Sequence, residues 1–499
     1  NVCIDHSQYF NKVLTRKTLA ADVNALSRAY GQGDTYTWTN TGNYVFDICK
    51  DHHFNVLVGS EAIKYTFEDI SAWRNHYAFE DDDYMQIGTG EGTQTNGGCK
   101  SQWALFSLFG KLDYNYAERY LFSATLRRDA TSRLYNKKNS GVFPAFSGAW
   151  RVSQEKFYPK NNIVNDAKVR VAWGQNGNSQ VVSNYAAYST YIFDNGNGAY
   201  DLEGTSYVSG IKLSATGNKD LKWETTTQTN LGFDLYMFNS SLSASFDYFW
   251  KKTKDMLMNI TLPAGSAAAS NLTYNGGSMS NKGWEFAFSS KNLIGTFKWN
   301  TDFNISFNKN KLESLALTQV YYDANTTDNV NEPVVRNTPG MPLGSFWGYI
   351  AEGVDPETGD MKYKDVTGDG LVSASDRTYI GDPNPDFTFG MTNTFSYKGL
   401  NLSILIQGSY GNDIYNVSRM ETEGMYDGKN QSTKVLARWR VPGQITDVPK
   451  AKWDIRNSTY FVEDGSYLRV KDISLSYDVP RKLISRFGLT RLQPYVSAT

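Results

Sequence analysis

The sequence of 499 residues is poor in the residues that build compact metal or disulfide sites. It has 3 cysteines, Cys3, Cys49 and Cys99, and 4 histidines. Three cysteines are too few for a disulfide scaffold, and their spacing is not that of a zinc site. The scarcity of histidine argues equally against a histidine-rich metal centre. Neither kind of site therefore organises this chain.

The sequence also lacks an excess of charge of either sign. Lys plus Arg is 50 and Asp plus Glu is 51, which gives a net charge of −1. A protein that tracks phosphates needs a basic face, so we expect no nucleic-acid partner. Neither a G-x-S-x-G nor an H-E-x-x-H motif is present, and no Cys/His arrangement stands in for them. We therefore expect a protein that is not an enzyme and has no catalytic residues.

Long hydrophobic runs are missing as well. No apolar stretch approaches the ~18 residues that a membrane helix requires. This excludes helical spans. It leaves a membrane β-barrel open, because alternating strands average to a polar composition.

Aromatic residues, in contrast, are abundant and follow a period of two. The chain has 33 Tyr, 27 Phe and 12 Trp. In 297–308 one face carries Phe297, Trp299, Thr301, Phe303, Ile305 and Phe307. Segments 230–238, 242–251 and 387–398 alternate likewise, and each segment of about 9–13 residues has the length of a strand that crosses a bilayer. A soluble sandwich with one buried face is the alternative, but membrane-length strands with rings near their ends favour a barrel.

Connections of two lengths alternate along the chain. The short ones are 50–52, 114–118, 239–241, 292–295 and 398–400, and the long ones are 68–99, 130–141, 176–222, 257–280, 310–344 and 411–459. Short turns at one rim and long loops at the other are typical of outer-membrane barrels. We expect an all-β fold, a large antiparallel transmembrane β-barrel that is partial, with about 14–16 strands in this chain and long extracellular loops. Segments 153–166 and 480–490 are expected to be longer inner-rim turns, each with one helical turn.

This topology bears on the cysteines. Cys49 adjoins a short turn and Cys99 closes a long loop, so the two would lie at opposite rims. A disulfide requires Cα atoms within ~7 Å, which argues against a Cys49–Cys99 bond. Pairing of Cys3 with Cys99 stays open.

Several sequence blocks resemble one family in its own order. They include "RYLFSATLRRDATSR" (119–133), "KVRVAWGQNGN" (168–178), "LKWETTTQTNLGFD" (221–234), "GDPNPDFTFG" (381–390) and "VEDGSYLRVKDISLSYDVP" (462–480). The chain resembles the SusC/RagA family of TonB-dependent outer-membrane transporters. The resemblance implies a plugged barrel of the ~22-strand type, in the cell outer membrane as a multi-pass β-barrel. Residues 1–499 would form a central and late portion, with the plug, the TonB box and the terminal strands outside this sequence.

The family resemblance also implies a function and partners. The protein would import oligosaccharides or peptides together with a SusD/RagB-like surface lipoprotein that serves as a lid. TonB–ExbB–ExbD would supply energy through regions absent here, and outer-membrane lipid would surround the barrel. The family also suggests a dimer of transporter–lipoprotein pairs. Substrate-binding residues stay unassigned, although loop aromatics such as Tyr185, Tyr188, Tyr191, Phe346 and Tyr349 are candidates for stacking on sugars or packing on a partner.

Residues 365–376, DVTGDGLVSASD, are similar to a calcium-binding loop. Hard oxygen donors on alternate residues, bent around a glycine such as Gly370, suit Ca²⁺. The ligands would be Asp365, Thr367, Asp369, Leu371 through its carbonyl, Ser373 and Asp376. Thr367 replaces the usual Asp or Asn, and Asp376 replaces the usual bidentate Glu. An Asp/Gly-rich surface turn without metal is the alternative to a structural Ca²⁺ that stiffens an extracellular loop.

Two other functions fit parts of the pattern. One is a soluble secreted calcium-binding β-rich adhesin or glycan-binding protein. The other is a β-rich glycoside hydrolase with two carboxylates at a cleft. Neither explains the outward aromatic faces or the ordered blocks, so we predict the transporter.

Overall fold

The computed structural model describes residues 2–13, 23–136, 138–159, 163–194, 200–201, 207–208, 210–261, 271–315, 320–325, 332–426 and 428–499. Within them, no helix has the length and apolar character needed to cross a membrane.

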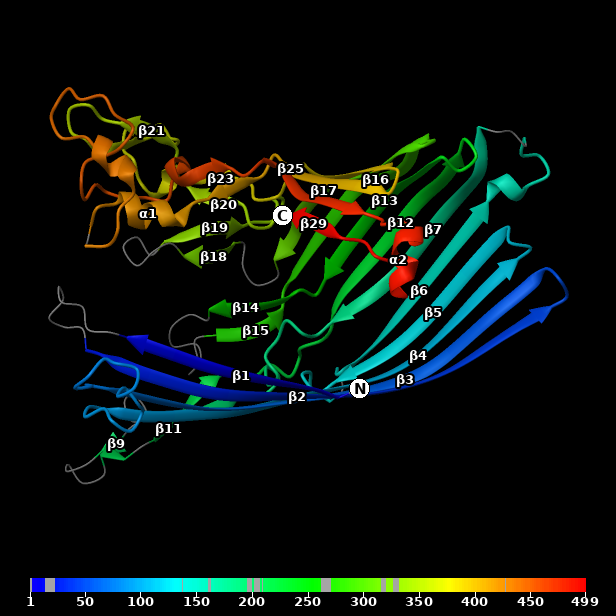
Figure 1. The fold of residues 1–499 in the computed structure, drawn as a ribbon. Coiled ribbons are helices and arrows are strands. Elements are labelled where there is room, and N and C mark those ends of the chain that lie inside the picture. Colours follow the sequence, from blue (N-terminus) through cyan, green and yellow to red (C-terminus); the bar gives the residue numbers. More distant parts are fainter. Residues whose placement is uncertain are drawn as a thin grey trace.

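One antiparallel sheet of 15 strands dominates the structure (Figure 1). This number lies within the expected 14–16. The strands, in spatial order, are β1 (Val2–Val13), β2 (Ala25–Ile48), β3 (His52–Asn75), β4 (Gln94–Tyr116), β5 (Tyr120–Thr131), β6 (Ser140–Arg151), β7 (Val164–Asn178), β12 (Glu224–Met237), β13 (Leu242–Lys254), β16 (Gly277–Ile294), β17 (Phe297–Leu315), β24 (Phe387–Tyr397), β25 (Leu400–Tyr410), β28 (Tyr467–Tyr477) and β29 (Tyr495–Ala498).

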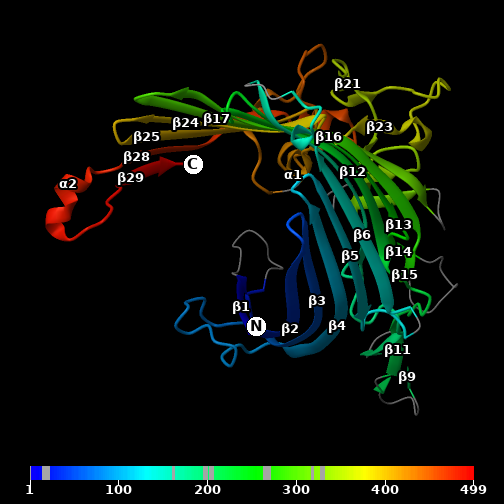
Figure 2. The ribbon, with the colours of Figure 1, turned by 90° about the vertical axis from the view of Figure 1, so that its right-hand side faces the viewer.

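The sheet curves into an open wall. Figure 2, which views it from the rim of short turns, shows an arc that runs from β2 through β12 to β28. The edge strands β1 and β29 lie apart in both ribbon views, and in the described part of the chain they do not pair with each other. The wall is therefore part of a barrel rather than a closed one.

Tight turns form one rim. The β4–β5 turn has Ala117 and Glu118 at φ +50° and +52°, and the β24–β25 turn has Lys398 and Gly399 at φ +47° and +90°. Two successive residues with positive φ give a hairpin the twist of its strands. The longer connections on this rim contain η1 (Val152–Gln154), α2 (Arg481–Ile484) and η5 (Ser485–Phe487), which confirms the helical turns expected in 153–166 and 480–490.

The opposite rim carries loops with structure of their own (Figure 1). Between β7 and β17 they hold β8 (Thr190–Asp194), β9 (Tyr200–Asp201), β10 (Tyr207–Val208), β11 (Gly210–Ala215), β14 (Leu257–Thr261) and β15 (Asn271–Asn275). Between β17 and β24 they hold β18 (Tyr321–Asn325), β19 (Pro333–Asn337), β20 (Phe346–Gly348), β21 (Ala351–Val354), β22 (Met361–Tyr363), η2 (Ala374–Asp376) and β23 (Thr378–Gly381). Between β25 and β28 they hold β26 (Asp413–Tyr415), α1 (Val417–Glu423), η3 (Thr433–Ala437), η4 (Thr459–Phe461) and β27 (Val462–Asp464).

Several strands are longer than the expected 9–13 residues. β2 and β3 have 24 residues each and β4 has 23. The expected long loop 68–99 is therefore wrong at both ends, because ladder pairing of β3 with β4 continues to Arg74 and Gln94. The parts of these strands that exceed the length of a bilayer crossing need no apolar face toward lipid. Hydrophobic alternation in the sequence therefore does not mark them.

The pairing of Cys3 with Cys99, which the sequence left open, is also wrong. Cys49 and Cys99 are both free thiols. The Sγ of Cys99 donates a hydrogen bond to Oδ1 of Asp69 on the next strand, at 2.7 Å. Cys3 lies on β1, separated from β4 by β2 and β3. Three strand spacings are about 14 Å, twice the Cα distance that a disulfide spans.

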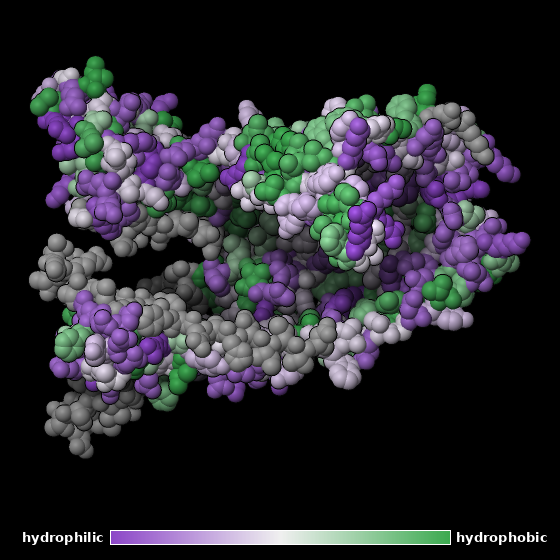
Figure 3. Space-filling model, in the orientation of Figure 1, coloured by the Kyte–Doolittle hydropathy of each residue, from purple (hydrophilic) through white to green (hydrophobic). Residues whose placement is uncertain are grey.

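The pairing register gives the wall two chemically different faces. Phe54, Tyr114 and Phe122 are directly opposite one another across β3, β4 and β5. Leu231, Tyr248 and Trp284 continue the same face across β12, β13 and β16. Neighbouring rings are in contact, with centroids 4.8 Å apart for Phe54–Tyr114 and 4.5 Å for Tyr248–Trp284. We call this apolar side the outer face; Figure 3 shows hydrophobic residues gathered over β17 and β25.

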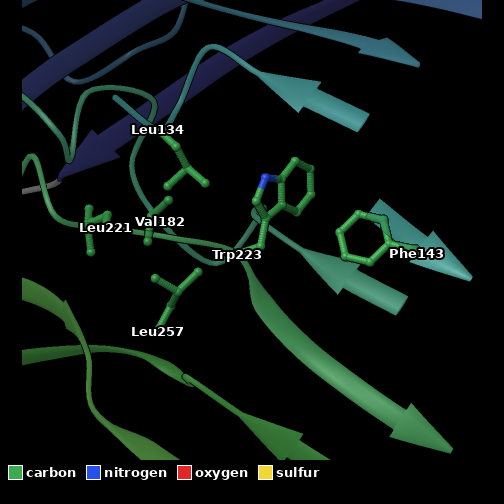
Figure 4. Close-up of a cluster of buried hydrophobic side chains, with 6 residues drawn as sticks. All are labelled: Leu134, Phe143, Val182, Leu221, Trp223 and Leu257. Atoms are coloured by element: carbon green, nitrogen blue, oxygen red, sulfur yellow. The ribbon is translucent and has the colours of Figure 1, made fainter. Parts of the chain in front are cut away.

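A hydrophobic cluster joins three of the loops at the long-loop rim (Figure 4). Its buried members are Leu134, Phe143, Val182, Leu221, Trp223 and Leu257. The Trp223 ring meets Phe143 edge-on at 5.4 Å, and its Nε1 donates to the carbonyl of Asn139 at 3.1 Å. The rim is thus a packed structure in which loops from β5, β7 and β13 fix one another.

Candidate functional site: the outer loops and the inner wall

Two insertions build a compact unit above the long-loop rim. We call residues 332–386 and 411–466 the outer-loop domain. Backbone bonds join the two segments: Tyr349 N to Asn457 O at 2.7 Å, Thr459 N to Tyr349 O at 3.0 Å, and Asp413 N to Asp382 O at 2.8 Å. Because each segment supplies partners for the other, neither can form this surface by itself.

The core of the outer-loop domain is mostly aromatic and sulfur-containing. Its buried members are Met361, Met420, Trp453, Ile455 and Phe461. Trp453 and Phe461 are 1% and 0% exposed and stack with their centroids 6.2 Å apart. A core of this kind fixes the relative positions of the loops, so the domain presents a preformed surface to the outside.

A buried ion pair stabilises α1 within this domain. Arg419 contacts Glu423 through Nε–Oε1 and Nη2–Oε2, both at 3.0 Å, and Glu423 is 2% exposed. Burial acts to raise the pKa of Glu423, but the hydrogen bonds and charge of Arg419 outweigh it and leave that pKa below its usual range. Burial, and next the charge of Glu423, raise the pKa of Tyr460 to about 12. Its hydroxyl therefore stays protonated and donates to Glu423 Oε2 at 3.0 Å.

The acidic loop 365–376 lies in the same domain and is closed by its own backbone. Asp376 is 0% exposed, and its Oδ1 accepts from the amides of Val366 and Thr367, both at 2.9 Å. Its Oδ2 accepts from Ser373 N at 2.7 Å, which completes a capping box on η2. These amides hold the pKa of Asp376 far below its usual range.

The other candidate ligands have a different arrangement. Asp365 accepts from Gly368 N at 2.6 Å and Gly370 N at 2.7 Å, and Asp369 accepts from Leu371 N at 2.9 Å. Among the described residues no three His, Cys, Asp or Glu side chains converge as a metal site. The six predicted residues thus share one turn, but their carboxylates bind amides and do not form a coordination sphere. Calcium binding stays a prediction.

The face opposite the aromatic rings, which we call the inner face, carries paired charges. On β5, Arg127 reaches Asp129 Oδ1 at 2.7 Å and Glu61 Oε1 on β3 at 3.0 Å. Its Nη2 also donates to Ser107 Oγ on β4 at 2.8 Å. The contacts of Arg127 therefore form an ion network across three strands.

A second inner-face network lies on β7, β12 and β13. Arg170 donates to Asp234 from Nε at 2.9 Å and to Asp247 from Nη2 at 2.9 Å, and Lys168 contacts Asp234 at 2.8 Å. Gly232 lies directly opposite both Arg170 and Asp247 in the register. A side chain at that position would collide with both groups, so glycine leaves the room in which they meet.

Polar residues of the alternating segments 242–251 and 297–308 share this inner face. Ser243 and Asp302 each pair with Ser289, and Asn304 pairs with Ala287, which pairs with Ser245. Asp247 lies on the same side of β13 and belongs to the Arg170 network. The alternation in the sequence therefore assigned these side chains to the correct face.

The loop aromatics divide into two groups. Phe346 and Tyr349 are 8% and 4% exposed and belong to the packing of the outer-loop domain. Tyr185, Tyr188 and Tyr191 are exposed at the long-loop rim. Three further loop tyrosines, Tyr200, Tyr207 and Tyr321, have side chains outside the described residues.

Sequence reasoning missed the partners Glu61, Lys168, Arg170 and Asp234. Each lies on a different strand from at least one partner, and strand order had to be known before they could be matched. The available signal was a charged residue at the polar position of an aromatic strand, as Asp234 is in 230–238.

Comparison with known proteins agrees with this architecture. The family model for the TonB dependent receptor-like, beta-barrel matches residues 4–493. TonB-dependent receptor P3 of Formosa agariphila is 31% identical over 464 residues, which are 89% of this chain and 46% of that protein. TonB-dependent receptor SusC of Bacteroides thetaiotaomicron is 28% identical over 444 residues, 85% of this chain and 42% of SusC.

A solved structure of the RagAB peptide transporter superposes on 99% of this chain and 55% of its own, with a TM-score of 0.84 and 25% identity. The chain thus spans about half the length of the curated relatives it matches. The family match covers nearly all of the sequence, and the two-faced antiparallel wall is the fold it describes. The chain therefore belongs to the TonB dependent receptor-like, beta-barrel family.

Proposed function

We propose that the full-length protein imports oligosaccharides or peptides across the outer membrane as a SusC-like, TonB-dependent transporter. The observation that carries this proposal is the family match over residues 4–493, together with its similarity to SusC and to the RagAB peptide transporter. A wall with an apolar outer face and a charged inner face suits a barrel between lipid and a watery interior.

The outer-loop domain supports a role in capture. Its core fixes a preformed surface at the long-loop rim, where a SusD/RagB-like lipoprotein would close over the substrate. Leu436, Val441 and Ile445 are 71%, 58% and 92% exposed on this domain. Exposed apolar side chains grouped in one short segment are typical of a surface that a partner covers.

The inner-face networks suit a wall that meets a plug. Arg127 and Arg170 each hold two carboxylates, so their charges are neutralised within the wall. A movable plug would then slide against fixed, satisfied dipoles instead of forming strong new ion pairs. TonB would act on that plug through segments outside this sequence.

The test is uptake by the full-length protein in its native outer membrane. Cells that carry or lack the gene receive labelled mixtures of oligosaccharides or of peptides, with and without TonB. Accumulation of one class that requires both the gene and TonB supports the proposal and names the substrate class. Uptake that is independent of TonB, or no gene-dependent uptake of either class, contradicts it.

A further inference from the structure

A cluster of lysines lies on the outer face of three neighbouring strands. Lys252 and Lys254 are on β13, Lys282 is on β16, and Lys309 and Lys311 are on β17. The register places them on the side of Tyr248, Trp284 and Phe307, the face that meets lipid. We call these five residues the lysine patch. None of the networks described above uses them.

The lysine patch lies at the height of the outer lipid headgroups. On β17 the outer face carries Trp299, Thr301, Phe303, Ile305 and Phe307 and then changes to lysine. From Trp299 to Phe307 is about nine residues, the span of a tilted strand across the hydrocarbon core. The lysines follow on the side of the long loops, so they come just after the outer aromatic belt.

The patch carries an unbalanced positive charge. Lys282 and Lys309 are directly opposite each other in the ladder, an arrangement of like charges that is unfavourable by itself. Among the described residues no carboxylate lies within the 4 Å of an ion pair from any of the five ammonium groups. The charges of Lys252, Lys282 and Lys311 act on the Glu313 carboxylate. That carboxylate accepts its hydrogen bond from Ser280 Oγ, at 2.6 Å.

The patch stops at the next two strands of the wall. Beside it and on the same face, β12 carries Thr225, Thr227 and Thr229 and β7 carries Gln175. The concentration of five lysines on β13, β16 and β17 points to one localised anion.

A cavity lies between the lysines and the aromatic belt. It has a volume of about 510 Å³ and is lined by Tyr248, Trp284, Phe307, Lys282, Lys309 and the single carboxylate Asp386. Its lining therefore combines three aromatic rings with two lysines. This combination suits a molecule with an apolar chain below and an anionic group above.

We propose that the lysine patch binds a phosphorylated glycolipid of the outer leaflet, with its phosphate between Lys282 and Lys309 and an acyl chain over Trp284 and Phe307. The proposal rests on the proposed function only in requiring that the wall spans the outer membrane. The phosphate would remove the repulsion between the opposed lysines, and the rings would cover the chain. The site would anchor this side of the barrel in its lipid.

The test compares lipid binding by the full-length protein and two variants. Each is extracted from outer membranes, freed of lipid in detergent and exposed to diphosphorylated lipid A, to dephosphorylated lipid A or to inorganic phosphate. Native mass spectrometry counts the bound molecules. The test variant is Lys282→Gln with Lys309→Gln. The matched control is Lys251→Gln, on the same strand as Lys252 but on the inner face.

We expect the double variant to bind diphosphorylated lipid A roughly tenfold or more weakly, because each lysine at an anionic lipid surface contributes about a factor of five. The Lys251→Gln control should match the unmodified protein, and dephosphorylated lipid A should bind weakly to all three. Retention of diphosphorylated lipid A by the double variant would overturn the proposal. So would displacement by inorganic phosphate, which would show a site for the free anion.

Uptake assays on the same variants separate this inference from the proposed function. Lipid binding without any import would contradict the transporter and leave the lipid site standing. Import without phosphate-dependent lipid binding would contradict the lipid site and leave the transporter standing. The heat-dependent gel mobility of each variant shows whether it is folded, and a folded double variant that binds like the unmodified protein contradicts the site.

Discussion

At the residue scale, two buried carboxylates of the outer-loop domain are fully paired. Glu423 has Arg419 and Tyr460 as partners, and Asp376 has three backbone amides. Charged groups are costly to bury unless they are paired and hydrogen-bonded. These two carboxylates therefore hold their loops in place through contacts within the protein.

Replacement of Arg419 by methionine should destabilise the outer-loop domain by about 3 kcal/mol, because it leaves the Glu423 carboxylate buried without its partner. Hydrogen exchange of segment 411–466 measures the change. Lys450→Gln is the matched control, since its partner Asp360 is 43% exposed and such surface pairs contribute little. Equal protection in both variants would contradict the importance of the buried pair.

The same pair predicts a pH dependence. The pKa of Glu423 is lower in the folded protein than in the unfolded chain, where it is about 4.3. Its contribution to stability is therefore fully present above that value and is lost as the pH falls through the lower folded pKa. Protection of segment 411–466 should stay constant from neutral pH to about pH 5 and decline only in more acidic solution.

The acidic loop gives a test that separates the amide hydrogen bonds of Asp376 from calcium binding. Asp376→Asn removes the charge that collects the amides of Val366, Thr367 and Ser373, so loop 365–376 should exchange faster with or without calcium. Asp369→Asn leaves the amide hydrogen bonds of Asp376 intact. It should weaken only a protection from hydrogen exchange that depends on calcium. If added calcium does not change exchange in the unmodified loop, the predicted ion is absent and the loop is a metal-free turn.

At the element scale, the connections are as organised as the strands. The segment around η3 belongs to the outer-loop domain, yet it leaves Leu436 and Ile445 71% and 92% exposed. Other apolar residues of this domain, such as Met420 and Phe461, are buried. The difference leaves these two side chains accessible to a partner outside the domain.

Leu436→Ser combined with Ile445→Ser should therefore weaken association with the proposed surface lipoprotein. A loss of roughly tenfold is expected, since each buried aliphatic side chain contributes about 1.5–3 kcal/mol when fully covered and less at a rim. Co-purification of the lipoprotein with the full-length protein measures it. Leu483→Ser, at a residue 62% exposed on the opposite rim, is the control. Unchanged co-purification would place the lipoprotein elsewhere on the loops.

At the scale of the whole molecule, the wall separates two environments by its register alone. A single ladder step turns Tyr248 toward lipid and Asp247 toward the interior, where Arg170 holds it. The inner networks cross three strands each, so they lock neighbouring strands in register as well as neutralising charge.

Arg170→Met should lower the stability of the full-length barrel by about 1–2 kcal/mol. It leaves Asp234 and Asp247 without their shared partner, and partial exposure of the group moderates the cost. The temperature at which the purified protein loses its heat-dependent gel mobility measures the effect. Lys298→Met, on the inner face of β17, should change it little. A drop of the same size in both variants would mean that inner-face charge in general, and not this network, stabilises the wall.

The sequence by itself determined the two-faced strands, the alternation of short and long connections, the number of strands and the family. These properties are local, because both an alternation with a period of two and a turn depend on residues that are adjacent in the sequence. The helical turns near Val152 and Arg481 were predictable for the same reason.

Tertiary structure alone decided which distant residues meet. The 24-residue length of β2 and β3 depends on strand pairing beyond the membrane, where no hydrophobic alternation marks it. The Arg127 and Arg170 networks, the core around Trp453 and Phe461, and the opposed Lys282 and Lys309 all join separate segments. The backbone amides that close loop 365–376 around Asp376 could not be predicted from the calcium-loop pattern. Nearly every residue has a backbone N–H, so residue types do not show which ones donate. Physical proximity across strands and loops is fixed only when the chain folds.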